Sequence, residues 1–78
     1  DPELQEAVLT VPHLTAEQVA AEANATKFLK YKLEEVDGSH PIIPGKLIRV
    51  AGNDSLALLA TVAHMDAEFV LLVPVGGM

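Results

Sequence analysis

The three histidines are the side chains of this 78-residue sequence best suited to metal binding or proton transfer. His13, His40 and His64 lie far apart, and the chain contains neither a His-x-x-x-His nor a Glu-x-x-His spacing. A zinc site needs three or four converging ligands, and the absence of cysteine removes thiolate ligands as well. His64, two residues from Asp66, is expected to be a structural histidine at the end of a strand. We therefore predict no metal site and no cofactor.

Nucleophilic catalysis finds equally little support. Ser39-His40 and Asp54-Ser55 place a nucleophile beside a base or an acid. Adjacent residues on a strand or turn seldom face each other, and no Gly-x-Ser-x-Gly elbow is present. The sequence predicts a protein without a catalytic site.

One loop could bind a ligand. Gly52-Asn53-Asp54-Ser55 places four turn-forming residues in a row. If a helix began directly after it, the backbone amides there could hold an anion. The loop has a single glycine and no lysine, and Asp54 would repel an anion. A plain turn is the first interpretation, and a small-ligand (anion) binding domain is the alternative function.

The charge balance argues against nucleic acid as a partner, and the short apolar runs argue against a membrane. Five basic residues stand against eleven acidic ones, giving a net charge of -6, whereas nucleic-acid binding draws most of its affinity from Lys and Arg. All five cations fall between residues 27 and 49. No apolar run approaches the roughly 18 residues of a membrane span. We expect neither nucleic-acid nor membrane binding, and the acidic, cysteine-free composition fits a cytoplasmic or virion setting.

These candidate residues must be positioned by a single small domain, predicted over residues 15–78 after an extended or frayed segment 1–14. Thr15 and Gln18 form a capping box, and Leu14 with Val19 brackets it as a hydrophobic staple, which predicts a helix over residues 15–26. Alternation then favours a strand over 27–36, followed by a turn at 37–39.

The second half of the domain allows two folds. A strand over residues 46–51 precedes the 52–55 loop, but the apolar run 56–65 suits either a strand or a helix. We predict an α+β fold, in which the N-terminal helix is followed by a small antiparallel four-stranded sheet, curled toward a barrel. The alternative is the helix plus a βαβ unit.

The last predicted strand carries the strongest functional signal. Residues 69–75 are apolar at nearly every position, as in a strand covered on both faces. A four-stranded sheet with one helix covers one face only, so a partner or the N-terminal segment must cover the other. We predict a non-enzymatic structural or protein–protein interaction module, self-associating or docked in a larger assembly. Its surface would combine helix 15–26 with Phe69, Leu71, Leu72, Val73 and Val75.

The order of features also resembles a known family. A short alanine-rich helix is followed by a strand, by a Pro44-Gly45-initiated strand, and by Val62-Ala63-His64 before the last strand. This order is similar to the barrel portion of phage late-control or baseplate-hub proteins. The resemblance implies a structural module in a ring assembly, with no catalytic residue to transfer.

Overall fold

The computed structural model describes residues 7–77, and the side chains of residues 7–75. In this part of the chain a short helix and six strands follow one another, with a 3-10 turn (Leu33–Glu35) between the second and third strands. Their bounds are β1 (Ala7–Thr10), α1 (Ala16–Ala25), β2 (Leu29–Lys32), β3 (Asp37–Ser39), β4 (Leu47–Ala51), β5 (Leu56–Met65) and β6 (Phe69–Gly77).

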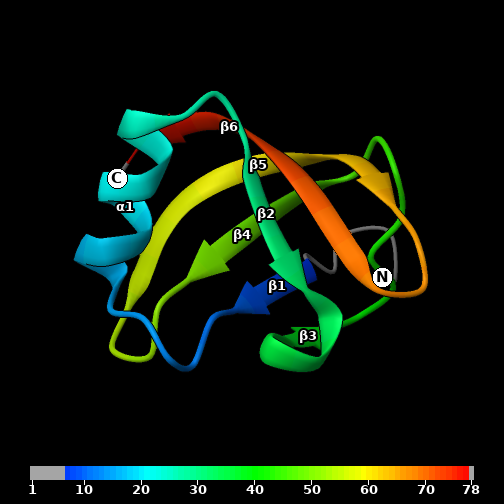
Figure 1. The fold of residues 1–78 in the computed structure, drawn as a ribbon, viewed down its shortest axis with the longest axis horizontal. Coiled ribbons are helices and arrows are strands. Elements are labelled where there is room, and N and C mark those ends of the chain that lie inside the picture. Colours follow the sequence, from blue (N-terminus) through cyan, green and yellow to red (C-terminus); the bar gives the residue numbers. More distant parts are fainter. Residues whose placement is uncertain (1–6, 78) are drawn as a thin grey trace, which may run out of the picture.

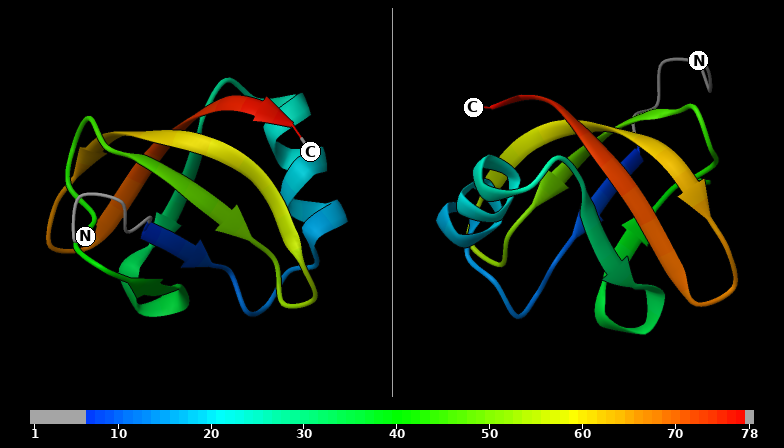
Figure 2. Two further views of the ribbon diagram at one scale, coloured as in Figure 1. Left: turned by 180° about the vertical axis from the view of Figure 1, so that it is seen from behind. Right: turned by 45° about the horizontal axis from the view of Figure 1, so that its top comes forward.

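The strands form one sheet in the order β2-β6-β5-β4-β1-β3 (Figure 1). All neighbours are antiparallel except β1 and β4, which run parallel. The sheet curls into a half-barrel, and α1 lies at one end of it (Figure 2). The predicted helix followed by a four-stranded sheet is therefore wrong, because the fold is mostly sheet and its first strand precedes the helix.

Two short strands account for the difference. β1 comes from the segment predicted to be extended or frayed, and it lies between β4 and β3 with Ala7 and Leu9 fully buried. Residues 1–6 of that segment lie outside the described residues. β3 consists of Asp37, Gly38 and Ser39, which were expected to form a turn. It lies at the edge of the sheet and each of its three residues is exposed, so turn-forming residues are tolerated there.

The predicted helix is confirmed. The Thr15 hydroxyl accepts from the Gln18 N–H at 3.2 Å, and the Gln18 side chain accepts from the Thr15 N–H at 2.8 Å. These two bonds satisfy amides that a helix start leaves unpaired. Val19 is the buried residue of α1. The predicted strand 27–36 is shorter, because the chain turns into the 3-10 turn after Lys32.

The run 56–65 is a strand that pairs antiparallel with β6, so the strand interpretation of this run is confirmed and the βαβ alternative is wrong. β5 pairs with β4 on one side and β6 on the other. Its residues Leu58, Ala60 and Val62 are buried at every second position, as the two-residue period of a strand requires.

The inner side of the curled sheet holds the hydrophobic core. Alternate residues of β1, β2, β4, β5 and β6 meet there with Val19 of α1. No buried polar or charged residue occurs among the described residues. The core consists of Ala7, Leu9, Val11, Val19, Leu29, Tyr31, Ile48, Val50, Ala57, Leu58, Ala60, Val62, Val70 and Leu72.

Candidate functional site

The outer side of the sheet is also apolar. On β4, β5 and β6 the residues that alternate with the core point to solvent. Leu47 pairs with Thr61, and Thr61 pairs with Val73, so these residues form one row across three strands. Leu47 is 51% exposed, Val73 40% and Val75 60%. We call this surface the outer face, and it comprises Leu47, Arg49, Leu59, Thr61, Leu71, Val73 and Val75.

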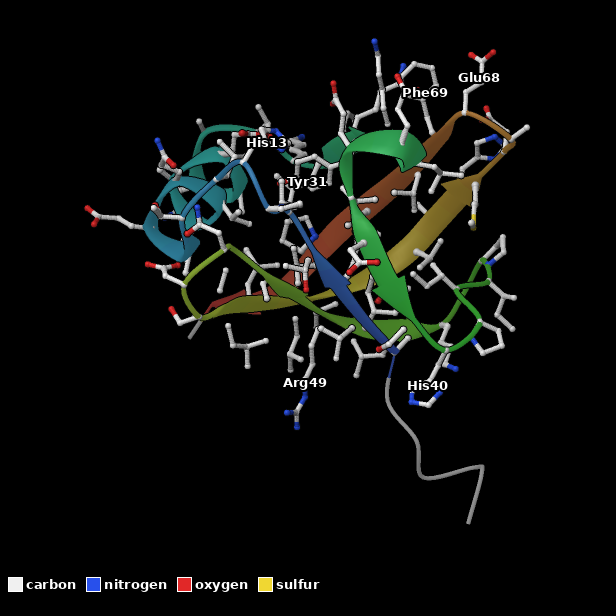
Figure 3. All side chains as sticks on the ribbon, turned by 90° about the horizontal axis from the view of Figure 1, so that it is seen from below. His13, Tyr31, His40, Arg49, Glu68 and Phe69 are labelled. Carbon is white, nitrogen blue, oxygen red and sulfur yellow. The ribbon has the colours of Figure 1, made fainter. Side chains whose placement is uncertain are left out.

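Positive charge accompanies the outer face. Arg49 is exposed, and in Figure 3 its side chain projects away from the sheet, on the side opposite Tyr31. Lys30 and Lys32 are the exposed residues of the neighbouring β2, where they pair with Leu71 and Phe69 of β6. The Lys30 Nζ lies 4.5 Å from the centroid of the Phe69 ring, within the range of a cation–π interaction.

The β6 residues of the predicted interaction surface lie on two opposite sides of the strand. Val73 and Val75 are exposed, and Phe69 and Leu71 are partly buried on the same side of β6. Leu72 faces the opposite side and is fully buried in the core. The exposed positions of α1 are mostly polar residues and alanines, so the helix adds no large apolar surface.

Leu47 and Leu59 were missed as surface residues, because the sequence does not show which side of β4 and β5 faces solvent. The alternation of Leu47, Ile48 and Arg49 along β4 was the available signal.

The open edge of β6 is blocked against further pairing. β2 pairs with β6 only from Phe69 to Leu72. The Leu33 N–H donates to the Glu68 carbonyl, so the even-numbered residues of β6 direct their backbone groups toward β2. The next such position is Pro74, which has no N–H to donate. Proline at this position, with Lys30 and Lys32 on β2, is typical of edges that resist strand addition.

The loop Gly52-Asn53-Asp54-Ser55 is hydrogen-bonded to the start of α1, and we call this contact the clamp. Asp54 Oδ1 accepts from the Ala16 N–H at 2.7 Å, and the Asn53 N–H donates to the Leu14 carbonyl at 2.7 Å. The Asp54 carboxylate thus occupies the position at a helix N-terminus where an external anion would bind. Because residues after the loop form β5, the helix start that motivated the anion-binding alternative does not exist.

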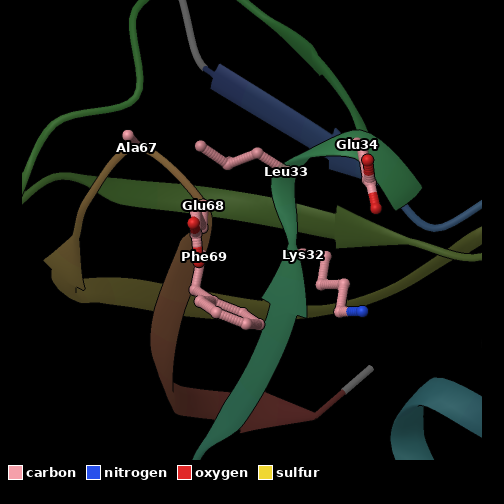
Figure 4. A pocket seen from close by; sticks show the side chains of 6 residues that line it. All are labelled: Lys32, Leu33, Glu34, Ala67, Glu68 and Phe69. Carbon is pink, nitrogen blue, oxygen red and sulfur yellow. The ribbon is translucent and has the colours of Figure 1, made fainter.

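A hollow of about 280 Å³ lies between the end of β2 and the turn joining β5 to β6 (Figure 4). One lysine, two glutamates and three apolar residues line it, and none of these charged groups is paired with a nucleophile or a histidine. The lining residues are Lys32, Leu33, Glu34, Ala67, Glu68 and Phe69.

Asp66 holds the turn beside this hollow. Its Oδ1 accepts from the N–H groups of Phe69 and Glu68, both at 2.8 Å. These two bonds lower the pKa of the Asp66 carboxyl, and the nearby His64 and Lys30 lower it further. The role of this carboxylate is to close the turn.

The predicted catalytic and metal candidates remain dispersed. The described residues contain no group of three or more His, Cys, Asp or Glu able to hold a metal ion. His64 Nε2 lies 3.9 Å from Asp66 Oδ2, and both side chains are largely exposed. His40 has a positive φ of 62°, a turn conformation that leads into Pro41.

Tyr31 is the chemically unusual group of the interior. It is 5% exposed, and its hydroxyl has no hydrogen-bond partner among the described residues. Burial raises its pKa to about 12, with a further contribution from the negative charge of Glu22. A phenol with so high a pKa stays protonated at neutral pH and is unsuited to act as a base.

Comparison of the chain with protein-family models, with curated proteins and with solved structures gives no match. The resemblance to phage baseplate-hub proteins therefore stays a prediction. Within residues 7–77, no helix has the length and apolar character needed to cross a bilayer.

Proposed function

We propose that this protein is a protein–protein interaction module that docks through the outer face of β4, β5 and β6. The observation that carries the proposal is the row of Leu47, Thr61 and Val73, extended by Val75, on the solvent side of a sheet whose other side is the core. Apolar residues clustered on one exposed face are typical of interaction surfaces.

Burial of this surface provides a driving force for binding. Fully covering an aliphatic side chain is worth about 1.5–3 kcal/mol, and Leu47, Val73 and Val75 are each about half exposed. A partner that covers them gains roughly 1 kcal/mol from each. The partly exposed Leu59 and Leu71 add to this surface.

The blocked edge favours face docking over strand addition. Pro74 removes a donor from the open part of β6, and lysines line β2. A partner that added a strand would lose a main-chain hydrogen bond at Pro74. The proposed contact is therefore made by side chains of the outer face.

Selection of binding peptides from a random phage-displayed library against the full chain tests the proposal. Synthetic peptides from the selection are then titrated against a double variant, Leu47→Ser with Val73→Ser. We expect at least tenfold weaker binding, because the apolar row is lost. The matched control is Ala21→Ser on the exposed side of α1. Peptides that bind the double variant with the same affinity as they bind the parent chain would contradict the proposal.

A further inference from the structure

Two prolines lie three positions apart in the loop that joins β3 to β4. Pro41 and Pro44 enclose two isoleucines, and this Pro-x-x-Pro segment belongs to neither a helix nor a strand. Figure 1 and Figure 2 show the loop at the opposite end of the molecule from α1. The outer face does not include this segment.

The backbone of the segment has the preferences of a polyproline II helix. Each proline ring holds φ near about −65°, and Ile43 is kept extended because it precedes a proline. The Lys46 N–H donates to the Ile43 carbonyl at 3.1 Å, and Gly45 has φ +89°. These are the features of a type II turn, with Pro44 as its first central residue. That position has φ and ψ of about −60° and +120°, which is close to polyproline II.

The side chains of the segment divide between the protein and solvent. A polyproline II helix has three residues per turn, so the two prolines share one edge and each isoleucine takes another. Ile42 is partly buried against the core, where it lies over Gly38 of β3. Pro41 and Pro44 are exposed, and Ile43 is 55% exposed. Two of the three edges are therefore open to a partner.

Hydrogen bonds hold the loop in this conformation. The Gly45 N–H donates to the Val62 carbonyl of β5 at 2.7 Å, and the Lys46 ammonium donates to the Pro41 carbonyl at 3.4 Å. Lys46 is thus engaged within the loop, and its charge plays no part in the contact that follows. Because the loop is already ordered, binding of a partner costs little conformational entropy.

We infer that Pro41, Ile43 and Pro44 bind a protein domain whose groove is lined by aromatic side chains. Exposed Pro-x-x-Pro segments dock into such grooves in SH3 and WW domains, where the preformed polyproline II helix keeps the entropic cost low. The two proline rings and the Ile43 side chain supply the apolar contacts. This contact goes beyond the proposed function, because it uses a surface separate from the outer face.

A second copy of the chain is a poorer occupant. A groove of this kind needs several aromatic side chains on one surface, and the chain has one tyrosine and two phenylalanines. Tyr31 is buried in the core. Phe28 precedes β2, whereas Phe69 pairs with Lys32 at the other end of that strand. The length of β2 separates the two phenylalanines, so the groove belongs to a different protein.

Titration of the full chain into a panel of purified SH3 and WW domains tests the inference. The chain contains no tryptophan, so fluorescence of the tryptophans in the domain reports binding. We expect at least one domain to bind saturably. Pro41→Ala with Pro44→Ala should weaken that binding at least about tenfold, because the ring contacts and the backbone restriction are lost. Ile43→Ser keeps both prolines and should weaken binding about fivefold, because an apolar contact is lost.

Pro12→Ala is the matched control, because Pro12 is exposed and lies outside the segment. It should leave the affinity unchanged, as should Leu47→Ser with Val73→Ser. A panel in which no domain binds would overturn the inference, and so would binding that survives both Pro41→Ala with Pro44→Ala and Ile43→Ser.

Two further outcomes separate the inference from the proposed function. Domain binding that is lost in Leu47→Ser with Val73→Ser, but kept when both prolines are replaced, would overturn the inference and favour the outer face as the docking surface. Library peptides insensitive to Leu47→Ser with Val73→Ser would overturn the proposed function and leave the inference standing.

Discussion

The carboxylate of Asp54 accepts a hydrogen bond from the N–H of Ala16, at 2.7 Å and across 38 positions of the chain. This bond joins the β4–β5 loop to the first turn of α1. The Asp54 side chain complements the positive end of the helix dipole from outside the helix. The loop thereby fixes the end of the sheet to the helix and leaves the outer face free of helical cover.

Replacing Asp54 tests this clamp. Asp54→Ala should lower the free energy of unfolding by roughly 1 kcal/mol, because the Ala16 N–H loses a charged acceptor. Asp54→Asn, which retains an oxygen but no charge, should cost less. Urea denaturation of the variants measures the effect. Asn53→Ala is the matched control, since the loop contact of Asn53 uses its backbone N–H. Equal stabilities of the Asp54→Ala and Asn53→Ala variants would contradict the clamp.

Replacing Gly52 with alanine tests how closely the 52–55 loop approaches α1. A Cβ at this position would lie only 2.2 Å from the Ala16 backbone nitrogen. Gly52→Ala should therefore cost at least about 2 kcal/mol of unfolding free energy. Gly45→Ala provides the contrast, because Gly45 has φ +89° but open space around its Cβ, so only the backbone strain of about 1 kcal/mol is expected. A smaller loss at Gly52 than at Gly45 would show that the loop moves away at little cost.

The single tyrosine gives a pH prediction. The pKa of Tyr31 is about 12 in the folded protein, against an ordinary value of 10.0. Folding thus favours the protonated phenol, so this contribution to stability is complete below pH 10 and is lost as pH rises through about 12. Absorbance of the phenolate, measured during an alkaline titration, should rise at higher pH in the native protein than in urea. Coincident titration curves would refute the burial of this hydroxyl.

Pro74 gives a prediction about association. Pro74→Ala restores an N–H on the open edge of β6, so concentration-dependent self-association should increase. Light scattering over a dilution series measures it. Pro44→Ala, in an exposed loop outside the strands, should leave association unchanged. An unaltered association state in Pro74→Ala would mean that Pro74 does not protect the edge.

Much of the fold follows from local sequence signals. The Thr15 and Gln18 capping box predicts α1, alternation predicts β4, and the continuous apolar run 69–75 predicts β6. The run that forms β5 suits a helix as well as a strand, because it is apolar at almost every position. The strand β1 was not predicted because four residues before a proline carry too short a pattern, and its stability comes from Ala7 and Leu9 buried between distant strands. For β3, pairing with β1 overrides a composition that favours a turn.

The candidate site was predicted only in part. The excess of apolar residues in 69–75 indicated an exposed surface, and Val73 and Val75 are exposed. A run that is apolar at every position does not reveal which residues face inward, so Leu72 was placed on the surface although it lies in the core. The contribution of Leu47 depends on the pairing of β4 with β5, which arises from tertiary structure.

The proposed partner covers the outer face, and NMR can locate its contacts residue by residue. Methyl resonances of the leucines and valines, recorded by NMR while a selected peptide is added to the full chain, test it most directly. We expect small shift changes at the core residues Leu29 and Val50, and the largest shift changes at Leu47, Leu59, Leu71, Val73 and Val75. Shift changes confined to residues near α1 or to the hollow at Leu33, with the outer-face methyl groups unmoved, would contradict it.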